Sequence, residues 1–125
     1  MNAQLVEIGG ERCLVVGNAA AVLRDVRGAT DLIGEAMSER ATMIVMPATK
    51  LDDAFFQLRS GLAGEVLQKA ANYRLKFAVI GDISAHVAAS EALRDFVVES
   101  NRGNGIFFVE DMAALEERLS ALPPD

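Results

Sequence analysis

The chain has 125 residues, of which 51% are hydrophobic and 24% are charged, and its formal net charge is −6. A chain of this length and composition is too apolar to be disordered, and we expect one domain over residues 1–125. The acidic balance argues against a nucleic-acid partner, which requires clustered Lys and Arg, and no apolar run reaches the roughly 18 residues that span a membrane. We therefore expect a cytoplasmic protein without a membrane partner.

Two β-prone runs near the N-terminus predict an antiparallel hairpin. Leu5–Ile8 and Glu11–Gly17 are joined by Gly9 and Gly10, the residue type that a two-residue turn with positive φ prefers. Cys13, the one cysteine, lies in the second run and is expected to be a buried small hydrophobe. A single cysteine also excludes a disulfide within the chain, as is typical of a reducing compartment.

The next segment is expected to change from extended to helical structure. We predict a short extended piece at Val22–Val26. A helix should follow, capped by Thr30 or Asp31 and running to about Arg40, because apolar residues recur there at helical spacing: Leu32, Ile33, Ala36 and Met37.

Three continuous apolar runs predict strands that are covered on both faces. They are TMIVMP (42–47), KFAVIGD (76–82) and GIFFVED (105–111), and each is separated from the next by enough residues for a helix. Such spacing is typical of parallel strands joined by helical crossovers. The sequence therefore predicts an α/β domain with a mostly parallel, mixed sheet, an N-terminal β-hairpin and flanking helices.

Two helices are predicted after the second of these runs. Ser84 is expected to cap one helix, with Gly103 just past its end and an apolar stripe formed by Ala89, Leu93, Phe96 and Val97. Asp111 is expected to cap the last helix, which Pro123 and Pro124 stop, and whose apolar positions are Met112, Leu115, Leu119 and Leu122.

The stretch RSGLAGEVLQKAANYR (59–74) allows two interpretations. If a helix starts at Gly61, Ser60 is its N-cap, and Gly61 and Gly64 let backbone or a partner approach closely. A phosphoryl group on Ser60 would then be tolerated by the helix dipole and countered by Arg59. Alternatively, one continuous helix runs from Asp53 and the glycines serve close packing against the sheet.

A second candidate region follows the strand at 76–80. Asp82 and Ser84 lie at the carboxyl end of a predicted parallel strand, where open α/β sheets bind ligands, although both residue types also cap helices. Arg94 and Arg102 complete a candidate set of polar contacts, unless they lie on solvated helix faces. With His86 as the only histidine and no nucleophile-elbow motif, we expect no metal, no cofactor and no catalytic residue.

The segment from Phe55 to Gly103, beginning FFQLRSGLAGEVLQKAANYRLKFAVIGDIS, resembles the bacterial domain-of-unknown-function 4180 family, and the likeness extends over nearly the whole chain. More remotely, the element order and Ser60-Gly61-Leu62 before a helix are similar to the STAS domain of sulfate-transporter tails and anti-sigma-factor antagonists. This resemblance implies that Ser60 takes the place of the serine phosphorylated by a partner kinase. Arg59 stands where antagonists usually carry an acidic residue.

Together these features favour a non-enzymatic regulatory or protein-interaction domain. Its contact region would be residues Ser60–Glu65 and the loop 81–84, and its partner an unidentified protein or a second copy of the chain. The alternative is a small-molecule-binding domain or enzyme that uses the crevice near Asp82 and Ser84. A deep pocket bearing Asp82 and Ser84 would favour the ligand, and an exposed Ser60 beside a shallow surface would favour the partner.

Overall fold

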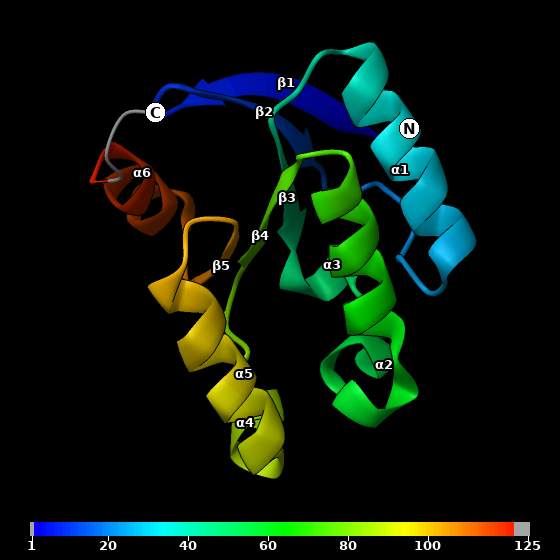
Figure 1. The fold of residues 1–125 in the computed structure, drawn as a ribbon, viewed down its shortest axis with the longest axis vertical. Helices are drawn as coiled ribbons and strands as arrows, with labels where there is room; N and C mark the ends of the chain where they lie inside the picture. The colour runs from blue at the N-terminus through cyan, green and yellow to red at the C-terminus, as the bar shows by residue number, and fades with distance from the viewer. Residues whose placement is uncertain (1, 122–125) are drawn as a thin grey trace.

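Five runs of the sequence form strands of one mixed sheet, with helices on both faces, in the computed structural model, which describes residues 2–121 (Figure 1). The strands are β1 (Ala3–Ile8), β2 (Glu11–Val16), β3 (Met43–Pro47), β4 (Lys76–Ile80) and β5 (Ile106–Val109). The helices are α1 (Val26–Ser38), α2 (Asp53–Phe56), α3 (Leu62–Asn72), α4 (Ser84–Ala89), α5 (Glu91–Arg102) and α6 (Met112–Ser120), with 3-10 turns η1 (Ala48–Lys50) and η2 (Leu58–Ser60).

The strands lie in the order β1-β2-β3-β4-β5, and this topology confirms the predicted fold class. β1 is antiparallel to β2, and the other neighbouring strands are parallel. The hairpin turn at Gly9 and Gly10 has φ values of 54° and 85°, in the left-handed region that glycine adopts without steric cost. Among residues 2–121, no helix is long and apolar enough to cross a membrane.

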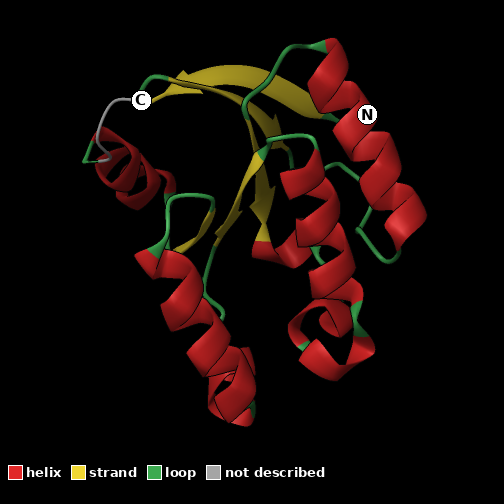
Figure 2. Cartoon of the chain, in the orientation of Figure 1, coloured by secondary structure: helices red, strands yellow, loops and turns green. Residues whose placement is uncertain are grey.

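Side chains alternate between the two faces of each strand, so the buried side chains form two clusters, one on each face of the sheet. Because both faces are covered, the apolar runs are continuous. The larger cluster includes Leu14 and Ile44 and packs against residues of α1, α3 and α5, among them Leu32, Val66 and Leu93. The smaller cluster lies on the other face, where Leu115 and Leu119 of α6 pack on strand residues: Ile8, Cys13, Met43, Val45, Ala78 and Phe107. Figure 2 shows α6 apart from the other helices.

The predicted start of the first long helix was wrong. α1 begins at Val26, because the extended residue Asp25 caps it by accepting a 2.9 Å hydrogen bond from the Gly28 amide. Thr30 lies inside the helix and donates to the Val26 carbonyl instead. The strand predicted at Val22–Val26 is reduced to a single bridge between Leu23 and Leu51.

The single helix predicted after Ser84 is two helices. Ser90 is extended, with φ −147° and ψ 111°, and its hydroxyl caps α5 by accepting a hydrogen bond from Leu93. Ser84 is the first residue of α4, and its amide donates to Asp82, so that Asp82 supplies the capping oxygen. Gly103 follows α5 as predicted, and Asp111 caps α6 as predicted. Leu122, Pro123 and Pro124 lie outside the described residues.

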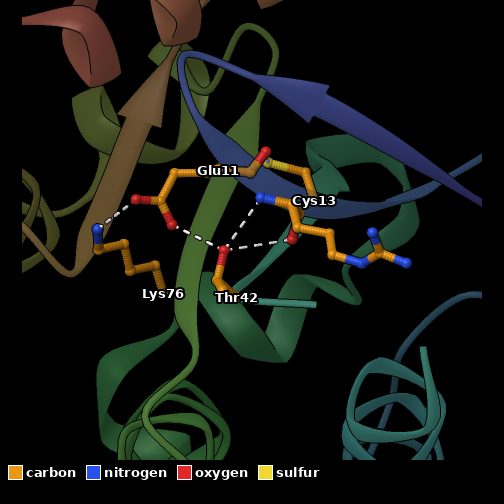
Figure 3. A network of polar contacts seen from close by, with 5 residues as sticks. Glu11, Cys13, Thr42 and Lys76 are labelled. Carbon is orange, nitrogen blue, oxygen red and sulfur yellow. Dashed lines mark hydrogen bonds and ion pairs between the residues drawn. The ribbon is translucent and has the colours of Figure 1, made fainter. Parts of the chain in front are cut away.

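A polar network ties three strands together at their N-terminal ends (Figure 3). Lys76 Nζ lies 2.7 Å from Glu11 Oε2, and the Thr42 hydroxyl donates to Glu11 Oε1 at 2.8 Å. The buried Cys13 thiol lies beside this network and donates to the Glu11 carbonyl. Burial and the nearby Glu11 charge raise the pKa of Cys13 to about 11, so this thiol stays protonated near neutral pH.

This network predicts a pH dependence of stability. Burial alone would raise the pKa of Glu11, but hydrogen bonds from Lys76 and Thr42 and the Lys76 charge outweigh it and lower that pKa from 4.5. A carboxyl with a lowered folded-state pKa contributes stability above its unfolded pKa, and this contribution is lost as the pH falls through the folded value. Urea denaturation of wild type and Glu11→Gln should therefore show a stability difference that shrinks below about pH 4.5. A difference independent of pH would contradict this assignment.

Candidate functional site

The crossover between β3 and β4 is broken at Ser60, which decides between the two interpretations of this stretch. Asp52 caps the short helix α2 by accepting from the Ala54 amide, and Gln57 leaves helical geometry with φ −97° and ψ 95°. The turn η2 then ends at Ser60, and Gly61 adopts φ 80°. α3 begins one residue later than predicted, at Leu62, so the continuous helix from Asp53 is not formed.

The Ser60 hydroxyl joins the two sides of this break. Ser60 is exposed, and its Oγ donates to the Ala54 carbonyl at 2.6 Å and accepts from the Leu62 amide at 3.2 Å. It therefore satisfies one of the free amides at the start of α3, although the residue directly before the helix is Gly61. Of the two interpretations, the broken helix with an exposed Ser60 near its start is the one that forms, but the N-cap of α3 is Gly61 and not Ser60.

The neighbours of Ser60 differ in their roles. Arg59 is exposed and forms no ion pair with any residue in the described part of the chain. Gly61 is required for its positive φ, whereas a Cβ at Gly64 would meet open space, so Gly64 is not needed for close packing within the domain. Glu65 is exposed in the first turn of α3 and, with Gly64, lines a shallow depression along this helix.

A cleft of about 740 Å³ lies beside this segment, between the α2–η2 region and α4. In Figure 1, α2 and α4 lie at the same end of the molecule. The rings of Phe56 and His86 stack with their centroids 4.2 Å apart, which joins the two walls. The lining residues are Phe56, Gln57, Leu58, Arg59, Ala85, His86, Ala89, Ser90 and Ala92.

The sequence prediction did not include this cleft. His86, which the sequence assigned to no site, is half-buried and stacks on Phe56. The small residues of α4 are the one sequence feature that could have indicated the cleft. The alanines at 85 and 89 leave that wall of the cleft without bulky side chains.

The four candidate ligand-binding residues lie in three separate places. Asp82 is exposed and accepts from the Ser84 amide; hydrogen bonds from the Ser84 side chain and backbone lower the pKa of Asp82. Arg94 lies 3.5 Å from Glu91, and Arg102 lies 3.5 Å from Glu99. The two arginines are about 12 Å apart along α5, from a rise of about 1.5 Å per residue. Within residues 2–121, none of the four lines the 740 Å³ cleft.

Residues 8–119 match the model of a family described as Domain of unknown function (DUF4180). The chain belongs to this family. The match runs from the last residue of β1 to the buried Leu119 of α6, so it covers most of the sheet, the break at Ser60 and the cleft of this DUF4180 domain. No curated protein and no solved structure matches it.

Metal-binding residue types do not gather in the described part of this DUF4180 domain. No group of three or more His, Cys, Asp or Glu side chains that could hold a metal ion is found among residues 2–121. The polar groups around the break are instead a hydroxyl, an arginine and the free amides of α3. Such groups are suited to an anion or to a protein surface.

Proposed function

We propose that this DUF4180 domain is a non-enzymatic regulatory domain that binds a protein partner through residues Ser60–Glu65 and the loop 81–84, and that phosphorylation of Ser60 switches the binding. The observation that carries the proposal is the exposed Ser60 hydroxyl, which bridges the backbone break between α2 and α3. A change at this one atom would act on both segments.

Phosphorylation would alter the hydrogen bonds at the break in a defined way. When a kinase transfers the γ-phosphoryl group of a nucleoside triphosphate, the Ser60 Oγ–H bond is replaced by an Oγ–P bond, and the nucleoside diphosphate and the proton are released. Ser60 Oγ could then no longer donate to the Ala54 carbonyl. That carbonyl would keep its bond from the Gln57 amide, so the loss need not unfold α2. The phosphoryl oxygens could accept from the free amides of α3 and from Arg59.

The added charge would change the surface that a partner meets. A phosphoserine carries about −1.5 to −2 charges near neutral pH, on a chain whose formal net charge is −6. Glu65 lies in the first turn of α3, so a second negative group beside it would repel an acidic partner and favour a basic one. The switch would therefore act through surface charge together with the loss of the hydrogen bond that ties Ser60 to α2.

The cleft of about 740 Å³ favours a second candidate, a small-molecule-binding domain or enzyme. Its lining is mostly apolar or small, and Asp82 and Ser84, on which the ligand hypothesis depends, are held in a helix cap. The exposed Ser60 beside a half-open cleft supports the protein partner better.

Mass spectrometry of the protein purified from its native cells tests the switch. We expect a phosphorylated peptide that contains Ser60, absent from a Ser60→Ala strain. Ser84 provides a matched comparison within the same chain, because it is also exposed and also begins a helix. Phosphate on Ser84 with none on Ser60, or an unmodified Ser60 in every growth condition, would contradict the proposal.

A thermal-shift screen with metabolites and nucleotides distinguishes the small-molecule candidate from the protein-partner proposal. Stabilisation that persists in Ser60→Ala but is lost in Ala89→Leu, which narrows the cleft, would support a small-molecule ligand.

A further inference from the structure

The outer edge of β1 carries unpaired backbone groups. β1 lies at the end of the sheet and pairs with β2 alone among the described strands. The Gly17 amide donates to the Asn2 carbonyl at 2.8 Å, and bonded pairs alternate along an antiparallel ladder. The backbone groups of Gln4, Val6 and Ile8 therefore face β2, and those of Ala3, Leu5 and Glu7 face outward.

The opposite edge of the sheet is blocked. β5 has only four residues, and the Asn101 side chain covers it by donating to the Phe108 carbonyl at 3.1 Å and accepting from the Phe108 amide at 2.8 Å. β1 has six residues, pairs with β2 in unbroken register, and contains neither the proline nor the lysine that commonly protects an edge strand. Figure 1 shows β1 as the outer border of the sheet.

We propose that two copies of this chain pair through β1, antiparallel about a two-fold axis at Leu5, so that one sheet continues across both copies. An antiparallel pairing of a strand with itself is self-complementary. This register places Leu5 opposite Leu5 of the second copy and Ala3 opposite Glu7 of the second copy. All the outward-facing residues of β1 then find partners, each pair exchanging two backbone hydrogen bonds.

The side chains of β1 fit this register. Glu7, the one charged residue of β1, lies opposite Arg12 in its own hairpin, and the register places Ala3 rather than a second Glu7 across the new interface. A shift that opposed the two carboxylates would be destabilising. Val6 is 36% exposed, and in the proposed pairing it lies beside Gln4 of the second copy, which would cover part of its apolar surface.

Sedimentation over a concentration series tests the pairing. We expect a dimer for wild type and at least about tenfold weaker association for Val6→Lys, which places like charges near the axis without removing a bond to β2. Val98→Lys is the matched control, because Val98 is 47% exposed on α5 and the charge change is identical. It should associate as wild type does. A wild-type monomer at all concentrations, or a dimer unaffected by Val6→Lys, would overturn the proposal.

Cross-linking tests the register independently of affinity. Residues opposite each other in a bonded antiparallel pair have Cα atoms about 5.5 Å apart, within the range that a disulfide spans. Oxidation with diamide should therefore link two Leu5→Cys chains, and it should not link two Val98→Cys chains. The native Cys13 is buried and stays out of the reaction. Equal cross-linking of the two variants, or none at position 5, would contradict Leu5 on the axis.

Discussion

Replacing Phe55 by alanine is expected to lower the free energy of unfolding by about 3–5 kcal/mol. Phe55 is 1% exposed and contacts two aromatic rings, packing edge-on to Phe56 at 5.4 Å and stacking on Phe77 at 6.3 Å between centroids. Removal of the ring loses buried apolar surface and leaves a cavity between α2 and β4. Urea denaturation monitored by circular dichroism should show a lower midpoint with an unchanged m-value.

Tyr73→Ala is the control for this substitution. Tyr73 is also aromatic but is 50% exposed, so its removal should change stability by no more than about 0.5 kcal/mol. A loss below about 1 kcal/mol for Phe55→Ala would mean that the surrounding side chains close the cavity, and that Phe55 does not anchor α2.

The sheet could be predicted from the sequence because its signals are local. Gly9 and Gly10 specify a tight turn, and their positive φ values bear this out. The three apolar runs predicted strands buried on both faces, and the two clusters on either side of the sheet explain why these runs do not alternate with polar residues.

Helix boundaries were less predictable because several residues competed for the same role. Asp25, Thr30 and Asp31 are all residue types that can cap a helix, and the structure uses Asp25, which follows the bridge between Leu23 and Leu51. Ser90 lies inside a stretch with a continuous helical pattern, yet its hydroxyl caps a new helix there. A serine within a helical pattern can lie inside one helix or cap a new one.

Only the part of the candidate site that depends on residues adjacent in the sequence could be predicted. The break at Ser60 follows from neighbouring residues, since Gly61 permits the positive φ and the Ser60 hydroxyl satisfies the Leu62 amide. The cleft depends on Phe56 and His86, which are far apart in the sequence and meet only through the tertiary fold. Local patterns carry no information about such a contact.

The hairpin turn and α6 constrain each other, and Gly9→Ala is expected to destabilise the fold by about 2–4 kcal/mol through both backbone strain and overpacking. Gly9 has φ 54°, and a Cβ there would lie 2.7 Å from Leu119 Cβ and 3.4 Å from the Ser120 amide nitrogen. A Cβ atom cannot rotate away from a neighbour, so α6 would have to move off the sheet. Hydrogen exchange should therefore speed up in α6 before it does in α3.

Gly10→Ala separates the two causes, because Gly10 has φ 85° but nothing within 4 Å of its Cβ position. Gly10→Ala should lower the free energy of unfolding only by the backbone strain, about 1–2 kcal/mol, and should leave hydrogen exchange in α6 unchanged. Equal losses of stability for the two variants would show that backbone strain alone causes the loss and that Leu119 moves aside for the new Cβ. A larger loss for Gly9→Ala, with faster exchange confined to α6, would show that this helix covers its face of the sheet only because position 9 has no side chain.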